Sequence, residues 1–116
     1  MQADRQIDGE IVFPADAAGG VAAQVTVELR DVSAQDQPSA LLAHATLFQV
    51  PVAPGQRVPF SLRAPPGVAG SALSMRVQVD MRAGNRHAPG DFLSTAAVRV
   101  PAGGDVHGLL VPVTRL

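Results

Sequence analysis

Hydrophobic and polar residues alternate one by one along most of the chain, which is the spacing of a strand with one buried and one solvent-facing side. The clearest cases are the segments 24–30 and 72–81, where valine, leucine and methionine alternate with polar side chains. Such alternation places all apolar side chains of a strand on one face. The segments that we predict to be strands are 6–13, 21–31, 41–50, 58–63, 72–81, 92–100 and 106–114.

Glycine and proline separate these segments and indicate turns. Pro54-Gly55 is typical of a tight turn, because proline presets φ and glycine accepts a positive φ. Pro59 lies inside a predicted strand, and since proline donates no ladder hydrogen bond, we expect that strand at a sheet edge. The segment 41–50 also fits a helical spacing, but its alternation up to Pro51 favours a strand.

The number and spacing of these segments predict the fold class. Short strands at near-regular intervals, separated by Gly/Pro turns, predict an all-β protein. We expect a seven-stranded antiparallel β-sandwich with Greek-key connections, of the transthyretin or immunoglobulin type. Its 116 residues are expected to form a single domain, 1–116, in which 1–5 are a disordered or cloning-derived N-terminus.

Composition excludes several classes of function. The net charge is -1, with 9 basic residues, all arginine, against 10 acidic ones. This balance does not provide the basic surface that nucleic-acid binding requires, so no nucleic-acid partner is expected. The absence of cysteine excludes disulfides and thiol nucleophiles, and the absence of lysine excludes Schiff-base chemistry. No apolar run reaches the length of a membrane span, and we expect no cofactor.

The residue types of metal and catalytic sites are present but scattered. His44, His87 and His107 are far apart in the sequence. They either converge through the fold on a metal or are ordinary surface histidines. Ser94, His87 and Asp91 contain the groups of a nucleophilic triad, but no nucleophile-elbow glycine pattern surrounds Ser94. We therefore expect no catalytic residue, no metal site and no enzymatic activity.

Two polar connections are candidates for other roles. Asp31 and Asp36 bracket a turn, and their carboxylates either cap it or belong to a calcium site, which would need more oxygen donors in closer succession. The longest polar connection is 82–91. Loops of this kind often carry ligand-binding groups. The side chains in this loop that can bind sugar hydroxyls or a carboxylate are Asn85, Arg86 and His87.

The predicted strand 41–50 is apolar on both faces. Its apolar residues are Leu42, Phe48 and Val50 on one side, and Leu41 and Leu47 on the other. In a two-layer sandwich, the outer face of such a strand is covered by a loop, a lipid or a partner protein. If the cover is a partner, Leu42, Phe48 and Val50 are the candidate contacts.

The order of residues also resembles a known family. The segments that carry the resemblance are 9–14, 25–33 with Asp36, 42–43, 58–62, 75–79 and 92–100. The most specific is the V-x-V-x-L-x-D-V-S-x-x-D run that starts at Val25. Across nearly the whole chain, this pattern resembles the YbaY-like lipoprotein family, which includes the YscW-type pilotins of type III secretion.

This resemblance implies a β-sandwich attached to a bacterial outer membrane and facing the periplasm. Attachment would be only through a lipidated N-terminal cysteine, which is absent from this chain. The implied function is a non-enzymatic, pilotin-like or chaperone-like lipoprotein domain that binds another envelope protein, such as a secretin-like one. The partner would add a strand or lay a helix against 41–50.

Two other functions are compatible with this fold class. The main alternative is a small-ligand or glycan-binding sandwich that uses the 82–91 loop, although the chain lacks the Trp and Tyr that often stack on sugars. The other is a transthyretin-like hydrolase. Residues 113–116 lack the Tyr-Arg-Gly-Ser ending of that group, which disfavours this assignment.

Overall fold

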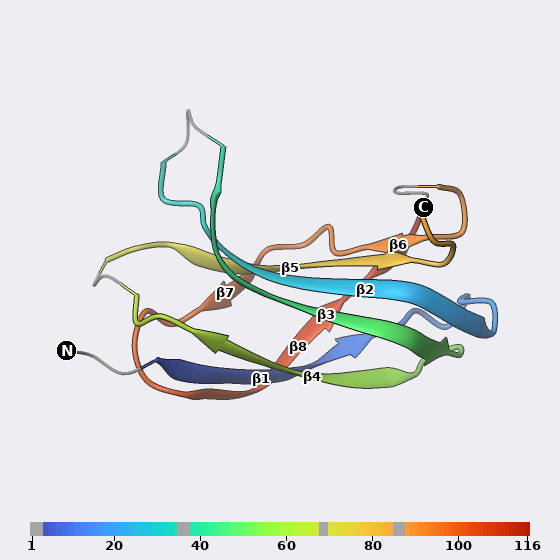
Figure 1. Cartoon of the computed structure of the whole chain (residues 1–116), viewed down its shortest axis with the longest axis horizontal. Helices are drawn as coiled ribbons and strands as arrows, with labels where there is room; N and C mark the ends of the chain where they lie inside the picture. The colour runs from blue at the N-terminus through green and yellow to red at the C-terminus, as the bar shows by residue number, and fades with distance from the viewer. Residues whose placement is uncertain (1–3, 35–37, 68–69, 85–87) are drawn as a thin grey trace.

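The computed structural model describes residues 4–34, 38–67, 70–84 and 88–116. They form two β-sheets packed face to face (Figure 1). The smaller sheet has the order β4-β1-β8, made of Arg57–Ala64, Arg5–Val12 and Val106–Pro112. The larger sheet has the order β3-β2-β5-β6-β9, with β7 also paired to β5; these strands are Ala40–Val52, Gly20–Asp31, Leu73–Asp80, Phe92–Leu93, Thr114–Arg115 and Val98–Val100. The described residues contain no helix, and the predicted all-β sandwich is confirmed.

The inward faces of the two sheets form an aliphatic core. Fully buried residues at alternate positions of β1, β2, β5 and β8 include Ile7, Ile11, Val25, Val27, Leu29, Val77, Val79 and Val111. The rings of Phe13 and Phe92 meet edge to face with centroids 5.1 Å apart. Because each buried side chain of this size contributes about 1.5–3 kcal/mol, the core is the main stabilising contribution.

Two of the predicted strands are each divided in two, so the described residues form nine strands where we expected seven. The segment 92–100 is interrupted at Ser94. There the Val77 amide donates its hydrogen bond to the side-chain Oγ of Ser94, at 2.8 Å, and not to a backbone carbonyl as in a regular ladder. The segment 106–114 is interrupted at Val113. At this residue the chain stops pairing with β1 and crosses to the larger sheet, where β9 pairs with β6.

One pair of strands departs from the predicted antiparallel arrangement. β8 runs parallel to β1, whereas the other pairs in the described chain are antiparallel. The reason is that β7 lies in the larger sheet. The chain crosses to the smaller sheet between Val100 and Val106 and enters it in the direction of β1.

The first strand begins inside the segment that we expected to be a disordered N-terminus. Arg5 is the first residue of β1, and only 5% of it is exposed. Its Nη1 donates to the carbonyl oxygens of Pro101 and Gly104 in the turn before β8. Arg5 therefore ties the start of the smaller sheet to a turn almost a hundred residues later in the chain.

Gly9 allows β1 to approach its neighbours closely. A Cβ atom at Gly9 would lie 2.5 Å from the carbonyl oxygen of Leu109 and 2.8 Å from Cζ of Phe60. The Leu109 oxygen belongs to the backbone of β8, which cannot move without disturbing its pairing with β1. The small side chain at this position is therefore a packing requirement.

We predict that Gly9→Ala lowers the free energy of unfolding by about 1–3 kcal/mol, because the added methyl group overpacks the contact between β1 and β8. The matched control is Gly103→Ala, since a Cβ there meets nothing within 4 Å. Urea denaturation measures both variants. Equal stability of the two would contradict this account of Gly9.

Candidate functional site

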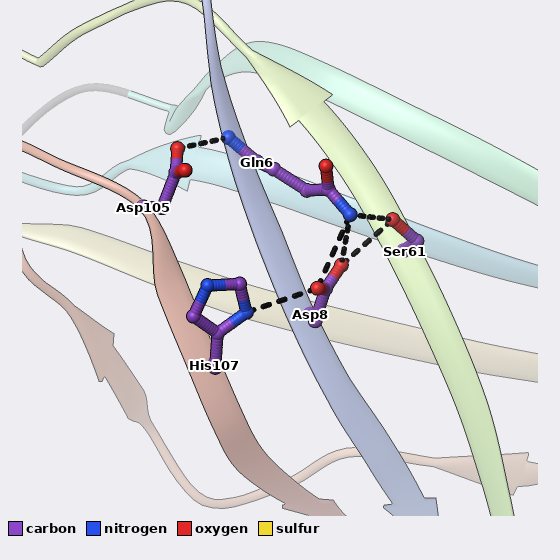
Figure 2. Close-up of polar contacts among 5 residues, drawn as sticks. All are labelled: Gln6, Asp8, Ser61, Asp105 and His107. Atoms are coloured by element: carbon purple, nitrogen blue, oxygen red, sulfur yellow. Dashed lines mark hydrogen bonds and ion pairs between the residues drawn. The ribbon is translucent and has the colours of Figure 1, made fainter.

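Polar side chains gather on the outer face of the smaller sheet (Figure 2). Gln6 and Asp8 extend from β1, Ser61 from β4 and His107 from β8. The Asp8 carboxylate accepts hydrogen bonds from Ser61 Oγ at 2.7 Å and from Gln6 Nε2 at 3.0 Å, and His107 Nδ1 lies 3.0 Å from its other oxygen. The Gln6 backbone amide donates to Asp105 at 2.9 Å. The cluster thus links all three strands of the sheet.

This cluster contains a serine, an aspartate and a histidine, but not in the geometry of a nucleophilic triad. In a triad the serine donates to the histidine, whereas here both Ser61 and His107 contact Asp8. The hydrogen bonds from Gln6 and Ser61, and then that of His107, lower the pKa of Asp8 below its ordinary value of 3.8. The arrangement keeps a charged carboxylate between three strands, which is a structural role.

A groove crosses the outer face of the larger sheet. Two adjoining hollows, of about 360 and 370 Å³, share Arg30, Arg76 and Ser94 and therefore form one groove. Outward side chains of β2 and β5 make its floor, and the segment 94–97 between β6 and β7 lines it on one side. In Figure 1 this segment and the two short strands lie beside β5.

The charges along this groove are unevenly paired. Arg30 donates from Nε and Nη2 to the two carboxylate oxygens of Glu28, both at 3.2 Å, and from Nη1 to the Ser39 carbonyl at 3.0 Å. Arg76 lies opposite Glu28 in the β2–β5 ladder, but among the described residues Glu28 forms its ion pair with Arg30. Arg76 and Arg99 are exposed and, within the described residues, have no ion pair.

The predicted partner contacts on β3 lie on different sides of the strand. Phe48 is 67% exposed, whereas Val50 is 8% exposed and belongs to the core, and Leu42 packs partly buried against the core. Gln49, with a φ of 53°, separates Phe48 from Val50, and the buried face of β3 changes there. Leu42 is the extra residue of a bulge opposite β2. Of the three residues, the structure places Phe48 alone at the surface.

These irregularities explain why the segment 41–50 has apolar residues at both odd and even positions. Leu47 packs against the core before Gln49, and Val50 and Val52 do so after it, so residues from both sets point inward. β3 also continues beyond Pro51, where we expected it to end. A proline fits there because β3 is the edge strand of its sheet.

The scattered histidines and loop residues do not form a metal site in the described part of the chain. His44 lies on β3 in the larger sheet, and His107 lies beside Asp8 in the smaller one. Among the described residues, no group of three or more His, Asp or Glu side chains could hold a metal ion. The residues Asn85, Arg86 and His87 lie outside the described residues.

Asp91 and Ser94 each have a structural role. Asp91 is buried, and its carboxylate accepts hydrogen bonds from the Met81 amide at 2.8 Å and the Ala88 amide at 2.9 Å. It thereby closes the base of the 82–91 loop. Ser94 bonds to the backbone of Val77 through both its amide and its Oγ.

Asp31 caps the turn that follows β2, as one of the two sequence interpretations proposed. Its Oδ1 accepts a hydrogen bond from the Ser33 amide at 2.9 Å, and the bonds from Ser33 lower the pKa of Asp31 below 3.8. Ser33 Oγ in turn accepts from the Ala72 amide at 2.8 Å, which fixes this turn to the start of β5. Asp36 lies outside the described residues.

In the part of the chain that the structure describes, no helix has the length and apolar character needed to cross a bilayer.

Together these features define the class of the protein: it is a β-sandwich whose larger sheet carries a cationic groove and an exposed phenylalanine on its surface. The chain belongs to the family of type III secretion system lipoprotein chaperones (YscW), whose model matches residues 2–100. The resemblance noted in the sequence is thereby confirmed. A search among curated proteins found no match.

The fold is also similar to a solved structure, that of an alternative pilotin from the type II secretion system of Vibrio cholerae. The two chains are 20% identical, the match covers 97% of this chain and 99% of the other, and the TM-score is 0.69. At this level of identity, the likeness shows that the two proteins share a fold.

We predict that Asp8→Asn removes part of the acid sensitivity of the domain. Hydrogen bonds lower the pKa of Asp8 in the folded state, so its contribution to stability is present above pH 3.8 and is lost as the pH falls through the folded-state pKa. Urea denaturation over the pH range of about 2–6 should show a steeper acid loss for the wild type than for the variant. Parallel curves would contradict this assignment.

Proposed function

We propose that this protein is the non-enzymatic domain of an envelope lipoprotein, which binds another envelope protein of the secretin type as a pilotin-like accessory chaperone. The observation that carries the proposal is the family match over residues 2–100. A fold shared with a pilotin over 97% of the chain supports it. The same family supports a location on the periplasmic side of the outer membrane, with a lipid anchor on a cysteine that is not part of this chain.

Phe48 is the best apolar contact for such a partner. It is the most exposed large hydrophobic residue among those described, and it pairs with Gln24 on the polar outer side of the larger sheet. Aromatic side chains, phenylalanine included, are enriched at protein interfaces, and burying a phenylalanine contributes about 1.5–3 kcal/mol. A partner that covers Phe48 would gain this contribution without disturbing the core.

Among the described strands β3 pairs only with β2, so its other edge offers a second kind of contact. An edge strand presents unpaired backbone groups to which an extended segment can add. The bulge at Leu42 interrupts this edge at one end, and Pro51, which has no amide hydrogen, interrupts it at the other. An added strand would therefore pair only with the stretch between them, next to Phe48.

We predict that Phe48→Asp reduces co-purification of the secretin-type partner by about tenfold or more, because a charged side chain cannot be buried at this contact without a large cost. Leu110→Asp is the matched control, since Leu110 is also exposed but lies on β8 in the smaller sheet. Thermal unfolding verifies that both variants fold. A folded Phe48→Asp variant that retains all its envelope partners would exclude this surface.

A further inference from the structure

We propose that the groove across β2 and β5 is the docking site for an acidic, partly apolar segment of the partner, and that Arg76 and Arg99 bind its carboxylates. The identity of the partner rests on the proposed function. The chemistry of the groove rests on its own side chains, which can be tested separately.

The charge of the groove favours an anionic ligand. Among the described residues, three arginines and a single acidic residue, Glu28, line the two hollows. Glu28 binds Arg30 through both oxygens, and among the described residues neither Arg76 nor Arg99 has an ion pair, so their charges are available to an external partner. The whole chain carries a net charge of -1, so this local excess of positive charge runs against the overall balance. A planar guanidinium can bind a carboxylate through two parallel hydrogen bonds.

The remaining lining favours a peptide over a small inorganic anion. Exposed Val32 and the methyl groups of Ala72, Ala96 and Ala97 line the same hollow as the arginines. An apolar wall of this kind contributes binding energy only to a ligand that carries apolar groups between its charges. A protein segment in which acidic residues alternate with aliphatic ones has this composition.

Hydroxyl groups complete the polar side of the groove. Ser94 Oγ accepts a hydrogen bond from the Val77 amide, which leaves its own hydrogen free to donate. The backbone of Ser94 is fixed by a second bond, from its amide to the Val77 carbonyl at 2.9 Å. Because this donor is held in place, it adds a directional contact beside the exposed guanidinium groups of Arg76 and Arg99.

The groove is continuous with the surface proposed for the apolar contact. Thr26, Glu28 and Arg30 line the groove, and Gln24, the next outward residue of β2, pairs with Phe48. One partner segment running across the larger sheet would thus meet carboxylate-binding arginines and an aromatic anchor in sequence.

The test uses a synthetic fluorescein-labelled peptide of glutamate, alanine and leucine, and a counterpart in which glutamine replaces every glutamate. Fluorescence anisotropy should show that the folded domain binds the glutamate peptide about tenfold or more tightly than the glutamine peptide, and that added salt weakens this preference. The double variant Arg76→Gln/Arg99→Gln should lose the preference. Arg63→Gln should keep it, since Arg63 is exposed on β4 in the smaller sheet.

Equal affinity for the two peptides, or an unchanged preference in the double variant, would overturn the proposal. Binding of the wild type to phosphatidylglycerol vesicles without binding to the glutamate peptide would also overturn it, because the positive charge would then serve the membrane.

A co-purification experiment separates this proposal from the proposed function. If the wild type and the double variant retain the secretin-type partner equally, the groove is not its docking site, and the function stands. If the wild type retains no such partner but prefers the glutamate peptide, the proposed function fails, and the assignment of an acidic ligand to the groove stands.

Discussion

The pairing of β2 with β5 at the centre of the larger sheet is the interaction on which the rest of the structure depends. From Gln24 to Asp31, β2 pairs with Asp80 to Leu73 of β5 without a register shift. Uninterrupted alternation over this stretch sends one set of side chains into the core and the other to the solvent. The same ladder therefore builds the aliphatic interior and the floor of the groove, and a slip of one residue would exchange the two.

Within this ladder, the ion pair of Arg30 and Glu28 contributes little to stability. Its main effect is on the direction in which the Glu28 carboxylate points. Both side chains are about one-fifth exposed, and a surface ion pair of this kind contributes about 0–1 kcal/mol. Its geometry matters because Glu28 would otherwise face Arg76 across the two strands. Glu28 is instead held toward Arg30, and Arg76, which has no ion pair among the described residues, is exposed and available to a ligand.

The parts of the fold that could be predicted from the sequence are the strands whose hydrophobic alternation matches the side that the folded protein buries. The strands 21–31 and 72–81 were predicted to within about a residue, because buried and outward positions alternate without a break from Gln24 to Arg30 and from Leu73 to Val79. For β3, the strand was predicted but the sides of its residues were not, since a bulge at Leu42 and a positive φ at Gln49 change the face twice. Neither feature has a glycine or another clear local signal in the sequence. The split at Ser94 likewise depends on a partner in another strand, Val77.

The groove could not be predicted from the sequence, because it exists only through strand register. Arg76 and Arg99 are far from Glu28 in the chain, and only the ladders β2–β5 and β5–β7 place them near one another. The signal available in the sequence was the arginines at outward positions of alternating strands. That signal becomes informative only when the neighbouring strands are known, since most such residues are simply solvated.

We propose that the outer face of the larger sheet binds an envelope protein. Hydrogen exchange of the backbone amides, measured with and without the purified secretin-type partner, tests this binding. We expect slower exchange in β3 between Ala43 and Val50 and in the segment 94–97 when the partner is present. Protection confined to the smaller sheet, around Asp8 and His107, would contradict it.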